Sequence, residues 1–192
     1  MKIPDYCFLR HGETAFNKAG ILHGQLDSDL TELGKSQAIQ QAKSLKKLNF
    51  SQDTLIYSSP LGRAVSTAEI IKNYCSLNVQ TDQNLAEVMM GEWQGKTWNE
   101  IRVEAPQFFS NNKTIFEISM LAPRGERYFD LCRRAERFIS SVSTPAIIIS
   151  HGVILNIVRG LIYNLSFEQM TKLSQRQGEV FIFANQGTCK NI

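Results

Sequence analysis

Four short runs of nearly continuous apolar residues constrain the fold of this chain more than any other feature of its sequence. They occupy residues 6–10, 54–59, 146–150 and 180–184, and longer, mostly amphipathic segments lie between them. Strands that are covered on both faces have this composition, because neither face meets water. The alternation predicts an α/β fold with a mainly parallel sheet, to which residues 78–82 add a weaker strand candidate.

A helical spacing of apolar residues predicts the layers that cover this sheet. The candidate helices span 31–48, 60–74, 127–139 and 152–163. The predicted apolar face of the first helix consists of Leu33, Ala38, Ala42, Leu45 and Leu48. Thr31 is its predicted cap, and Pro60 is predicted in the first turn of the second helix.

The length of the chain suits one domain. A chain of 192 residues can bury roughly two-thirds of its unfolded surface in a single core. It contains no internal repeat, low-complexity tract or linker-like stretch, so we expect one domain over residues 1–192. Residues 92–124 are less regular and include two prolines, and we expect this excursion to form a partial cover over the site.

Composition excludes several classes of partner. The net charge is +3, which is too small to indicate a nucleic-acid partner. The basic cluster Lys43, Lys46 and Lys47 is predicted to be a solvated helix face. No membrane span is expected either, because polar residues such as His151 and Arg159 interrupt the strongest apolar stretch.

The cysteines and the N-terminus favour a cytoplasmic protein. The four cysteines are scattered and form no C-x-x-C pair, a pattern typical of reduced thiols rather than of a disulfide framework. Pro4 and Asp5 interrupt any apolar run near the N-terminus, so no signal peptide is predicted. Both a monomer and a homodimer are compatible with these features.

Three polar motifs directly follow predicted strands. RHGET follows the first strand, SSPLGRA follows the second, and SHG follows the strand at 146–150. The carboxyl ends of parallel strands meet at one edge of a sheet, where open α/β folds bind their ligands. We therefore expect these three motifs to meet in one pocket.

The residue types in these motifs suit a phosphoryl group. Arg10 and Arg63 carry permanent charges and planar donor forks that match phosphate oxygens. His151 and Gly152 lie at a predicted helix start, where free N–H groups and the helix dipole favour an anion. Gly12 would allow the backbone to come close to a ligand.

His11 has three candidate roles: a packed core residue, a metal ligand or a nucleophile. A neutral imidazole at the floor of such a pocket could attack phosphorus in line and form a phosphohistidine, which splits one displacement into two. The arginines would stabilise the equatorial oxygens, a task that divalent metals perform in many other sites. In this context we favour the nucleophile.

No metal site and no cofactor are predicted. Zinc requires three or four clustered ligands, whereas the three histidines are remote in sequence and form no H-x-x-x-H motif. Magnesium would depend on carboxylates such as Glu13 and Asp27, and the adjacent arginines would oppose a cation.

The leaving group needs a proton donor, and residues 84–98 offer two candidates, Glu87 and Glu92. A short segment bracketed by glycines can hold a carboxylic acid over a pocket. Both glutamates could equally be solvated loop residues, so the residues alone do not choose between them. Trp93 and Trp98 are predicted to pack rather than to bind a ligand.

Six stretches, in order along the chain, resemble the histidine phosphatase superfamily, also called the phosphoglycerate mutase-like family. They are LRHGET, Asn17, GQLDSDLTELGKSQA, SSPLGRAVSTA, LAEVMMGEWQGKTW and SHG. The resemblance spans residues 6 to about 160. It implies a three-layer αβα fold and metal-independent phosphoryl transfer from a small phosphorylated metabolite.

The resemblance also implies a role for each matching residue. His11 would be the phosphorylated nucleophile, and Glu87 would be the proton donor. The residues implied to bind the transferred group are Arg10, Arg63 and His151, with Asn17 assisting.

Four positions depart from the family pattern. Many relatives read G-R-x-Q-G where this chain reads GILHG, which places Ile21 and His23 at the arginine and glutamine positions. His23 is therefore a candidate substrate contact. Asn156 stands where relatives often have an arginine, and Arg127 replaces the serine of a G-E-S motif.

The acceptor of the phosphoryl group distinguishes a phosphatase from a mutase. The mutases resembled here have a basic, proline-rich insertion that holds the second acidic group of phosphoglycerate, whereas residues 102–123 have little basic character. Residues 88–90 also lack the mutase-like R-x-Y-G surroundings. We therefore expect a phosphatase, with a mutase and a non-catalytic phosphate-binding module as alternatives.

Overall fold

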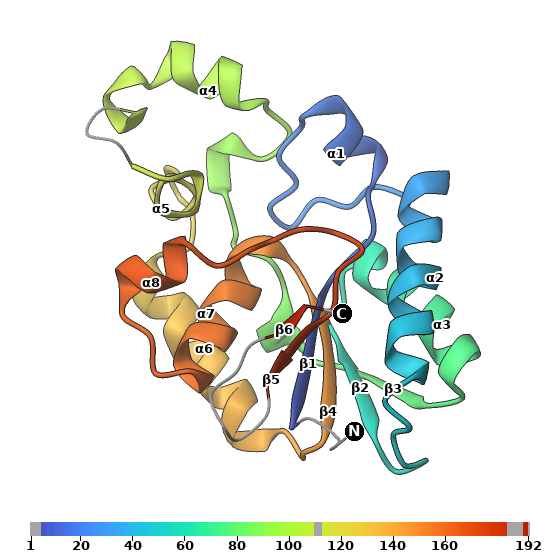
Figure 1. Ribbon diagram of the computed structural model, residues 1–192. Helices are drawn as coiled ribbons and strands as arrows, with labels where there is room; N and C mark the ends of the chain where they lie inside the picture. The colour runs from blue at the N-terminus through green and yellow to red at the C-terminus, as the bar shows by residue number, and fades with distance from the viewer. Residues whose placement is uncertain (1–4, 110–112, 184–189, 192) are drawn as a thin grey trace.

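A mainly parallel sheet forms the centre of the computed structural model, which describes residues 5–109, 113–183 and 190–191. The strand order across the sheet is β3-β2-β4-β1-β5-β6 (Figure 1). The strands are β1 Tyr6–Arg10, β2 Leu55–Ser58, β3 Asn78–Thr81, β4 Ala146–Ser150, β5 Phe181–Phe183 and β6 Lys190–Asn191. The five predicted strands are confirmed, although the last one is shorter than predicted and Ala184 lies outside the described residues.

The strands that carry the polar motifs lie side by side. β4 pairs in parallel with both β1 and β2, and β3 is parallel to β2. β5 and β6 are antiparallel to their neighbours. All five residues of β4 are buried, as expected for a central strand with a helical layer on each face.

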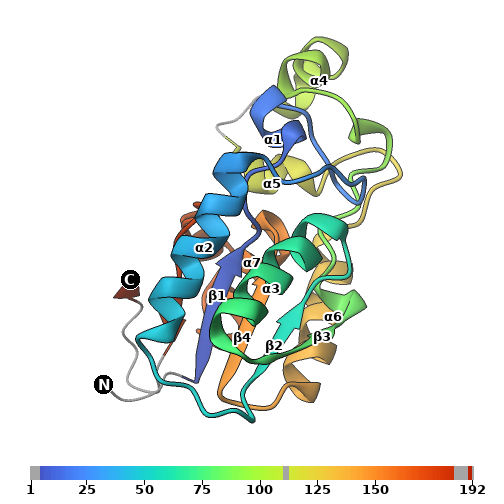
Figure 2. The same cartoon turned by 90° about the vertical axis from the view of Figure 1, so that its right-hand side faces the viewer.

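Helices cover both faces of the sheet. The helices are α1 Ala15–Ala19, α2 Glu32–Lys46, α3 Gly62–Cys75, α4 Trp98–Glu104, α5 Ile115–Ser119, α6 Tyr128–Ser141, α7 Gly152–Ile162 and α8 Phe167–Thr171. In Figures 1 and 2, α2 and α3 lie against one face, and α6 and α7 lie against the other. The three-layer αβα fold is thereby confirmed.

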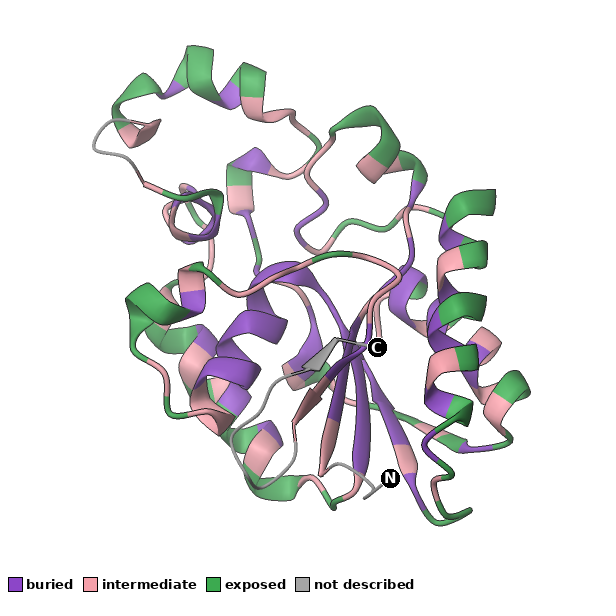
Figure 3. Cartoon of the chain, in the orientation of Figure 1, coloured by how far each residue is buried: buried purple, intermediate pink, exposed green. Residues whose placement is uncertain are grey.

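Alternate strand residues separate the core into two layers. Cys7 and Leu9 of β1 pack against α2 and α3, whereas Phe8 packs on the side of α6 and α7. The buried strands and the fully buried stretch of α7 stand out from helices with an exposed outer face (Figure 3). This period-2 pattern holds the strand ends, and the motifs that follow them, in fixed positions.

Two predictions about helix positions were wrong. Pro60 is not in the first turn of α3, because Leu61 is the N-cap and Gly62 is the first helical residue. Leu33 does not belong to the buried face of α2, since its exposed fraction is 54%. Gly34 is buried instead, because at this point the helix presses directly on the chain that follows β1.

A contact between two glycines brings α2 against the R-H-G loop. A Cβ atom on Gly34 would lie 2.0 Å from the carbonyl oxygen of Glu13, and one on Gly12 would lie 2.2 Å from the carbonyl oxygen of Gly34. Any side chain at either position would collide with backbone that cannot rotate away. The closeness of α2 to the loop therefore requires glycine at both positions.

The excursion over residues 92–124 contains short helices. It includes the 3₁₀ turns Gly91–Trp93 and Pro106–Phe109 together with α4 and α5, and it lies above the carboxyl ends of the strands (Figure 1). Residues 110–112 of the excursion lie outside the described residues.

The structure also shows how exposed the lysine cluster is and the state of three of the cysteines. Lys43, Lys46 and Lys47 are exposed, as predicted. Cys7, Cys75 and Cys132 are free thiols, and Cys189 lies outside the described residues. Among the described residues, the helices are too short or too polar to cross a membrane.

Substitution of Gly34 by alanine should destabilise the fold. In an unconstrained helix this change would add about 1 kcal/mol of stability, but here the collision with the Glu13 carbonyl should cost roughly 1–3 kcal/mol instead. Urea denaturation of G34A can be compared with Ser36→Ala, an exposed site on the same helix. A stabilised G34A variant would contradict the proposed close contact.

Candidate active site

A pocket of about 220 Å³ lies at the carboxyl ends of β1, β2 and β4. Its floor is lined by Arg10, His11, Asn17, Arg63 and Glu87. These residues come from four separate segments of the chain, and the sheet topology brings them together. Gly152 of the third motif also lines the pocket, so the predicted convergence of the three polar motifs at one sheet edge is observed, although His151 itself is fully buried and is not among the lining residues.

Hydrogen bonds fix the orientation and the tautomer of His11. The side chain is 2% exposed, and Nδ1 lies 2.8 Å from the Gly12 carbonyl oxygen, so Nδ1–H must donate. Nε2 then carries the lone pair and accepts from Arg63 Nε–H at 3.3 Å. The nucleophilic nitrogen of a neutral imidazole thus faces the guanidinium group in the pocket.

The charge state of His11 follows from its surroundings. Burial, and then the positive charges of Arg10 and Arg63, hold the pKa of His11 well below its ordinary value. The ring is therefore neutral at physiological pH. A neutral ring keeps the Nε2 lone pair available for attack.

Arg63 is held by two carbonyl oxygens, by the Asp27 carboxylate and by His11. Its Nη1–H donates to Leu26 O at 2.7 Å, and its Nη2–H donates to Gly24 O at 2.9 Å. Asp27 adds an ion pair at 3.3 Å. These contacts fix the orientation of the guanidinium group in the pocket, and the Asp27 carboxylate balances part of its charge.

A strap between α8 and β5 holds Arg10. The strap crosses the carboxyl end of the sheet (Figure 1), and its Gln175 carbonyl accepts from Arg10 Nη1–H at 2.9 Å. Gln177 in the same strap donates to Asn17 Oδ1 at 3.0 Å. The strap therefore positions two of the predicted substrate-binding side chains.

His151 is held by the serine motif after β2. Its Nε2 lies 2.7 Å from Ser59 Oγ, which already accepts from the Leu61 N–H. The Ser59 hydroxyl is thus free to donate to Nε2, which favours the Nδ1–H tautomer of His151. The rings of His151 and His11 are 5.1 Å apart.

Two buried nitrogens beside the floor have no protein partner. Within the part of the chain that the structure describes, Arg10 Nε and His151 Nδ1 make no hydrogen bond. Buried donors of this kind are costly unless a ligand completes them. An anion with several oxygen acceptors fits both of them.

The structure separates the two candidate proton donors. Glu87 lines the pocket, whereas Glu92 points outward and pairs with Arg124 at 3.3 Å. The Glu87 carboxylate accepts from the N–H groups of Val153 and Ile154, both at 3.2 Å. These two amides at the start of α7 therefore bind Glu87, and are not open to an anion as the sequence suggested.

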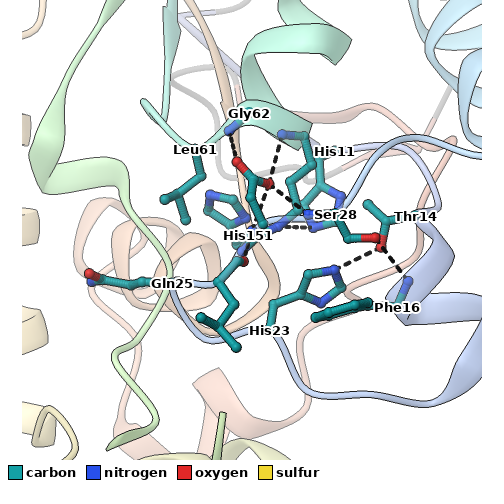
Figure 4. Close-up of polar contacts among 12 residues, drawn as sticks. His11, Thr14, Phe16, His23, Gln25, Ser28, Leu61, Gly62 and His151 are labelled. Atoms are coloured by element: carbon teal, nitrogen blue, oxygen red, sulfur yellow. Dashed lines mark hydrogen bonds and ion pairs between the residues drawn. The ribbon is translucent and has the colours of Figure 1, made fainter. Parts of the chain in front are cut away.

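His23 lies in the pocket wall and points toward the Thr14 hydroxyl, with Nε2 at 2.8 Å from Oγ1 (Figure 4). Burial and the charges of Arg63 and Arg10 lower the pKa of His23 to about 4. Thr14 also caps α1 and accepts from the Asn17 N–H. His23 thus supports the turn that carries Asn17.

Only two of the four departures from the family pattern face the pocket. Ile21 and His23 line it. Asn156 is buried and donates to the carbonyl oxygens of Met170 and Leu173, both at 3.2 Å. Arg127 donates to the Met120 carbonyl at 2.9 Å. Of the four, only Ile21 and His23 are therefore placed where they could contact a bound ligand.

The sequence missed part of the pocket wall. The lining residues that it did not single out include Ile115, Phe116, Ser119 and Gln175. Trp93 is buried in the core as predicted, but Trp98 both packs and lines the pocket. The capping boxes Thr97–Glu100 and Thr114–Glu117 mark the starts of α4 and α5, and they were available as a signal.

The described residues include no group of three or more His, Cys, Asp or Glu side chains that could hold a metal ion. Asp27 and Glu13 bind backbone and hydroxyl groups: Asp27 accepts from the Arg63 N–H at 3.1 Å, and Glu13 accepts from Thr31 at 2.7 Å.

Comparison with known proteins identifies the family. The sequence model that describes the histidine phosphatase superfamily (branch 1) matches residues 6–191 of this chain. A glucosyl-3-phosphoglycerate phosphatase from Mycolicibacterium vanbaalenii is 40% identical over 55% of this chain, but the match spans only 46% of that relative. The Mycobacterium tuberculosis enzyme of the same name is 32% identical, over 79% of this chain and 72% of its own. A probable phosphoglycerate mutase, GpmB, from Yersinia pestis is also 32% identical, and this match covers 88% of this chain and 79% of that protein.

Solved structures agree with the fold. Bacillus stearothermophilus YhfR has a TM-score of 0.79 and 30% identity, with 96% of this chain and 93% of that chain covered. The mycobacterial glucosyl-3-phosphoglycerate phosphatase Rv2419c in complex with VO3 has a TM-score of 0.80 and 27% identity. The match covers 98% of this chain and 96% of that chain.

Replacement of Asp27 by asparagine should weaken the fold in a pH-dependent manner. Burial alone would raise the pKa of Asp27, but the N–H groups of Arg63 and Gly62 lower it below its ordinary value. The carboxylate therefore stabilises the folded state above the unfolded-state pKa of about 3.9, and this contribution is lost as the pH falls through the lower folded-state value.

We expect D27N to lose about 1 kcal/mol at neutral pH, the usual effect of a lost helix cap, and the difference from the parent chain to shrink below about pH 4. Urea denaturation of D27N and of the parent chain, at neutral pH and again below about pH 4, measures this difference in the free energy of unfolding. Asp53→Asn, at an exposed site before β2, is the control. Equal stability of D27N and the parent chain at neutral pH would rule out the capping role.

Proposed function

The chain belongs to the histidine phosphatase superfamily, and from this premise we propose that it hydrolyses a small phosphorylated metabolite through a phosphohistidine on His11, without a metal ion. The phosphatase relatives support its class as a phosphoric monoester hydrolase. The observation that carries the proposal is a neutral His11 whose Nε2 faces Arg63 in a pocket that a second, half-buried guanidinium group, that of Arg10, also lines.

Substrate binding would place the phosphoryl group among the floor residues. The guanidinium groups of Arg10 and Arg63 would bind its oxygens, and the Nδ1–H of His151 would donate to another. Asn17, which also lines the floor, would assist. These fixed donors supply the charge that a divalent cation supplies elsewhere, and they would repel such a cation from the same position.

The first chemical step would form a bond between His11 Nε2 and phosphorus while the ester P–O bond breaks. The departing alkoxide would take a proton from Glu87, acting in its protonated form. In the second step, Glu87 would accept a proton from water as the water oxygen attacks phosphorus. The N–P bond then breaks, and inorganic phosphate and neutral His11 are released.

We also propose that residues 1–192 act as one domain in the cytoplasm, on a small-molecule phosphate and not on nucleic acid. The low net charge supports the last point.

A mutase is the second candidate, because a relative carries the name probable phosphoglycerate mutase. A mutase must retain a substrate with a second acidic group. Of the described residues that line the pocket, only Arg10 and Arg63 are cations, and both belong to the floor. Hydrolysis is therefore favoured, and faster isomerisation than hydrolysis of 3-phosphoglycerate would reverse this choice.

Replacement of His11 by alanine should reduce turnover of p-nitrophenyl phosphate by roughly 10⁴-fold or more, as for loss of a nucleophile. EDTA should leave the activity of the parent chain unchanged. Quenching in alkaline detergent with ³²P-labelled substrate, conditions under which the N–P bond survives, should trap a phosphoenzyme in the parent chain and none in H11A. An active H11A variant would exclude the nucleophile, and full inactivation by EDTA would exclude the metal-free mechanism.

Substitution of Glu87 by glutamine should reduce kcat for an alkyl phosphate by about 10²–10⁴-fold, the usual contribution of a general acid. The loss should be smaller with p-nitrophenyl phosphate, whose leaving group needs little protonation. Glu92→Gln is the matched control and should leave both rates near those of the parent chain. Equal effects of the two substitutions would contradict the assignment of Glu87.

A further inference from the structure

The pocket has a chemically distinct wall on the side away from the floor arginines. The apolar residues that line it are Ile21, Leu22, Val88, Met90, Trp98, Ile115, Phe116 and Val153. They come from the loop after α1, the segment after Glu87, and the helices α4, α5 and α7. We call this set the apolar wall.

Two of the polar side chains that line the pocket bind other groups of the chain, and the amides of Asn17 and Gln175 also line it. The Ser119 hydroxyl donates to the Ile115 carbonyl at 2.7 Å, and His23 Nε2 is hydrogen-bonded to the Thr14 hydroxyl. Arg10 and Arg63 remain the only cations among the described lining residues, and the phosphoryl group occupies them in the proposed function. A carboxylate or a dense set of hydroxyls against this wall would lose water without gaining partners.

The apolar wall is built into the fold. Trp98 packs edge-on against Trp93 and Phe109, at 6.5 and 6.1 Å between ring centroids. Phe116 packs against Phe167 of α8 at 5.9 Å. Side chains that are fixed by aromatic neighbours form a pre-organised surface, which selects for shape as well as polarity.

The pocket is partly open to solvent, so its volume indicates the size of the group that the wall can cover rather than the size of the whole ligand. The pocket of about 220 Å³ must also hold the phosphoryl group, and a dry cavity of about 150 Å³ accepts a benzene ring. The remaining space therefore suits one ring or an equivalent branched chain. The two aromatic residues Trp98 and Phe116 suit a flat group.

We infer that the substrate is the phosphomonoester of an uncharged, largely apolar alcohol about the size of a single ring. This inference rests on the proposed phosphatase function and narrows it to a substrate class. It also assigns the α4–α5 excursion the role of selecting that class.

Three esters of primary alcohols test the inference, since they differ little in leaving group: benzyl phosphate, glucose 6-phosphate and 3-phosphoglycerate. We expect kcat/KM for benzyl phosphate to exceed that for 3-phosphoglycerate by about tenfold or more, the scale on which apolar pockets discriminate. Glucose 6-phosphate should fall between them or near the acidic ester. Preference for 3-phosphoglycerate or for the sugar phosphate would overturn the inference.

A charge placed in the wall should change this preference. Ile115 is 48% exposed, so Ile115→Lys can be introduced without opening the core. It should lower the ratio of kcat/KM for benzyl phosphate over 3-phosphoglycerate by about tenfold. The control Val103→Lys adds the same charge to α4 at a site that is 83% exposed and outside the pocket lining. An unchanged ratio in I115K would overturn the role of the wall.

Binding measurements separate the two proposals. Calorimetric titration of the H11A variant with benzyl phosphate and with 3-phosphoglycerate reports the preference of the wall without turnover. If the parent chain hydrolyses none of the three esters, the proposed function fails, while tighter binding of benzyl phosphate would still support the wall. Hydrolysis of all three esters with equal affinities would sustain the function and overturn the inference.

Discussion

The placement of two guanidinium groups, one buried and one half-buried, beside one imidazole is the constraint on which the rest of this structure depends. A buried cation is costly unless its N–H groups find acceptors, and here backbone carbonyls supply most of them. Gly24 and Leu26 bind Arg63, and Gln175 binds Arg10. The loop before α2 and the strap before β5 therefore must follow their observed paths for the two charges to coexist.

Burial, together with the same two charges, determines the state of the histidines around them. Burial first, and the arginine charges second, lower the pKa of all three rings and keep them neutral, and the hydrogen bonds then decide which nitrogen of each ring bears the proton. On His11 the proton lies on Nδ1, away from the pocket; on His151 the serine contact favours a proton on Nδ1. One environment thus suits two histidines to the opposite tasks that we propose for them, one as an electron-pair donor and one as a hydrogen-bond donor.

The sequence predicted the sheet, the main helices and the convergence of the floor residues, because strand burial and motif position depend on local patterns. It could not predict which face of α2 turns inward at Gly34, since that depends on a contact with the distant Glu13 carbonyl. It also could not choose between Glu87 and Glu92 from the residues alone. The wall residue Ile115 was missed because a five-residue helix is too short for apolar periodicity to reveal its packing partner.

The residues that α4 and α5 present to the pocket, Trp98, Ile115 and Phe116, are apolar and carry none of the charges of the floor. They can therefore be exchanged for other apolar residues without adding or removing a charge beside His11. In an ancestral lineage, change in such an appended segment would alter which esters are accepted while the bond-breaking machinery stays intact. The floor residues would thus determine the reaction, and the excursion would determine which ester is accepted. Substitutions in α4 and α5 alone would then be enough to change the substrate.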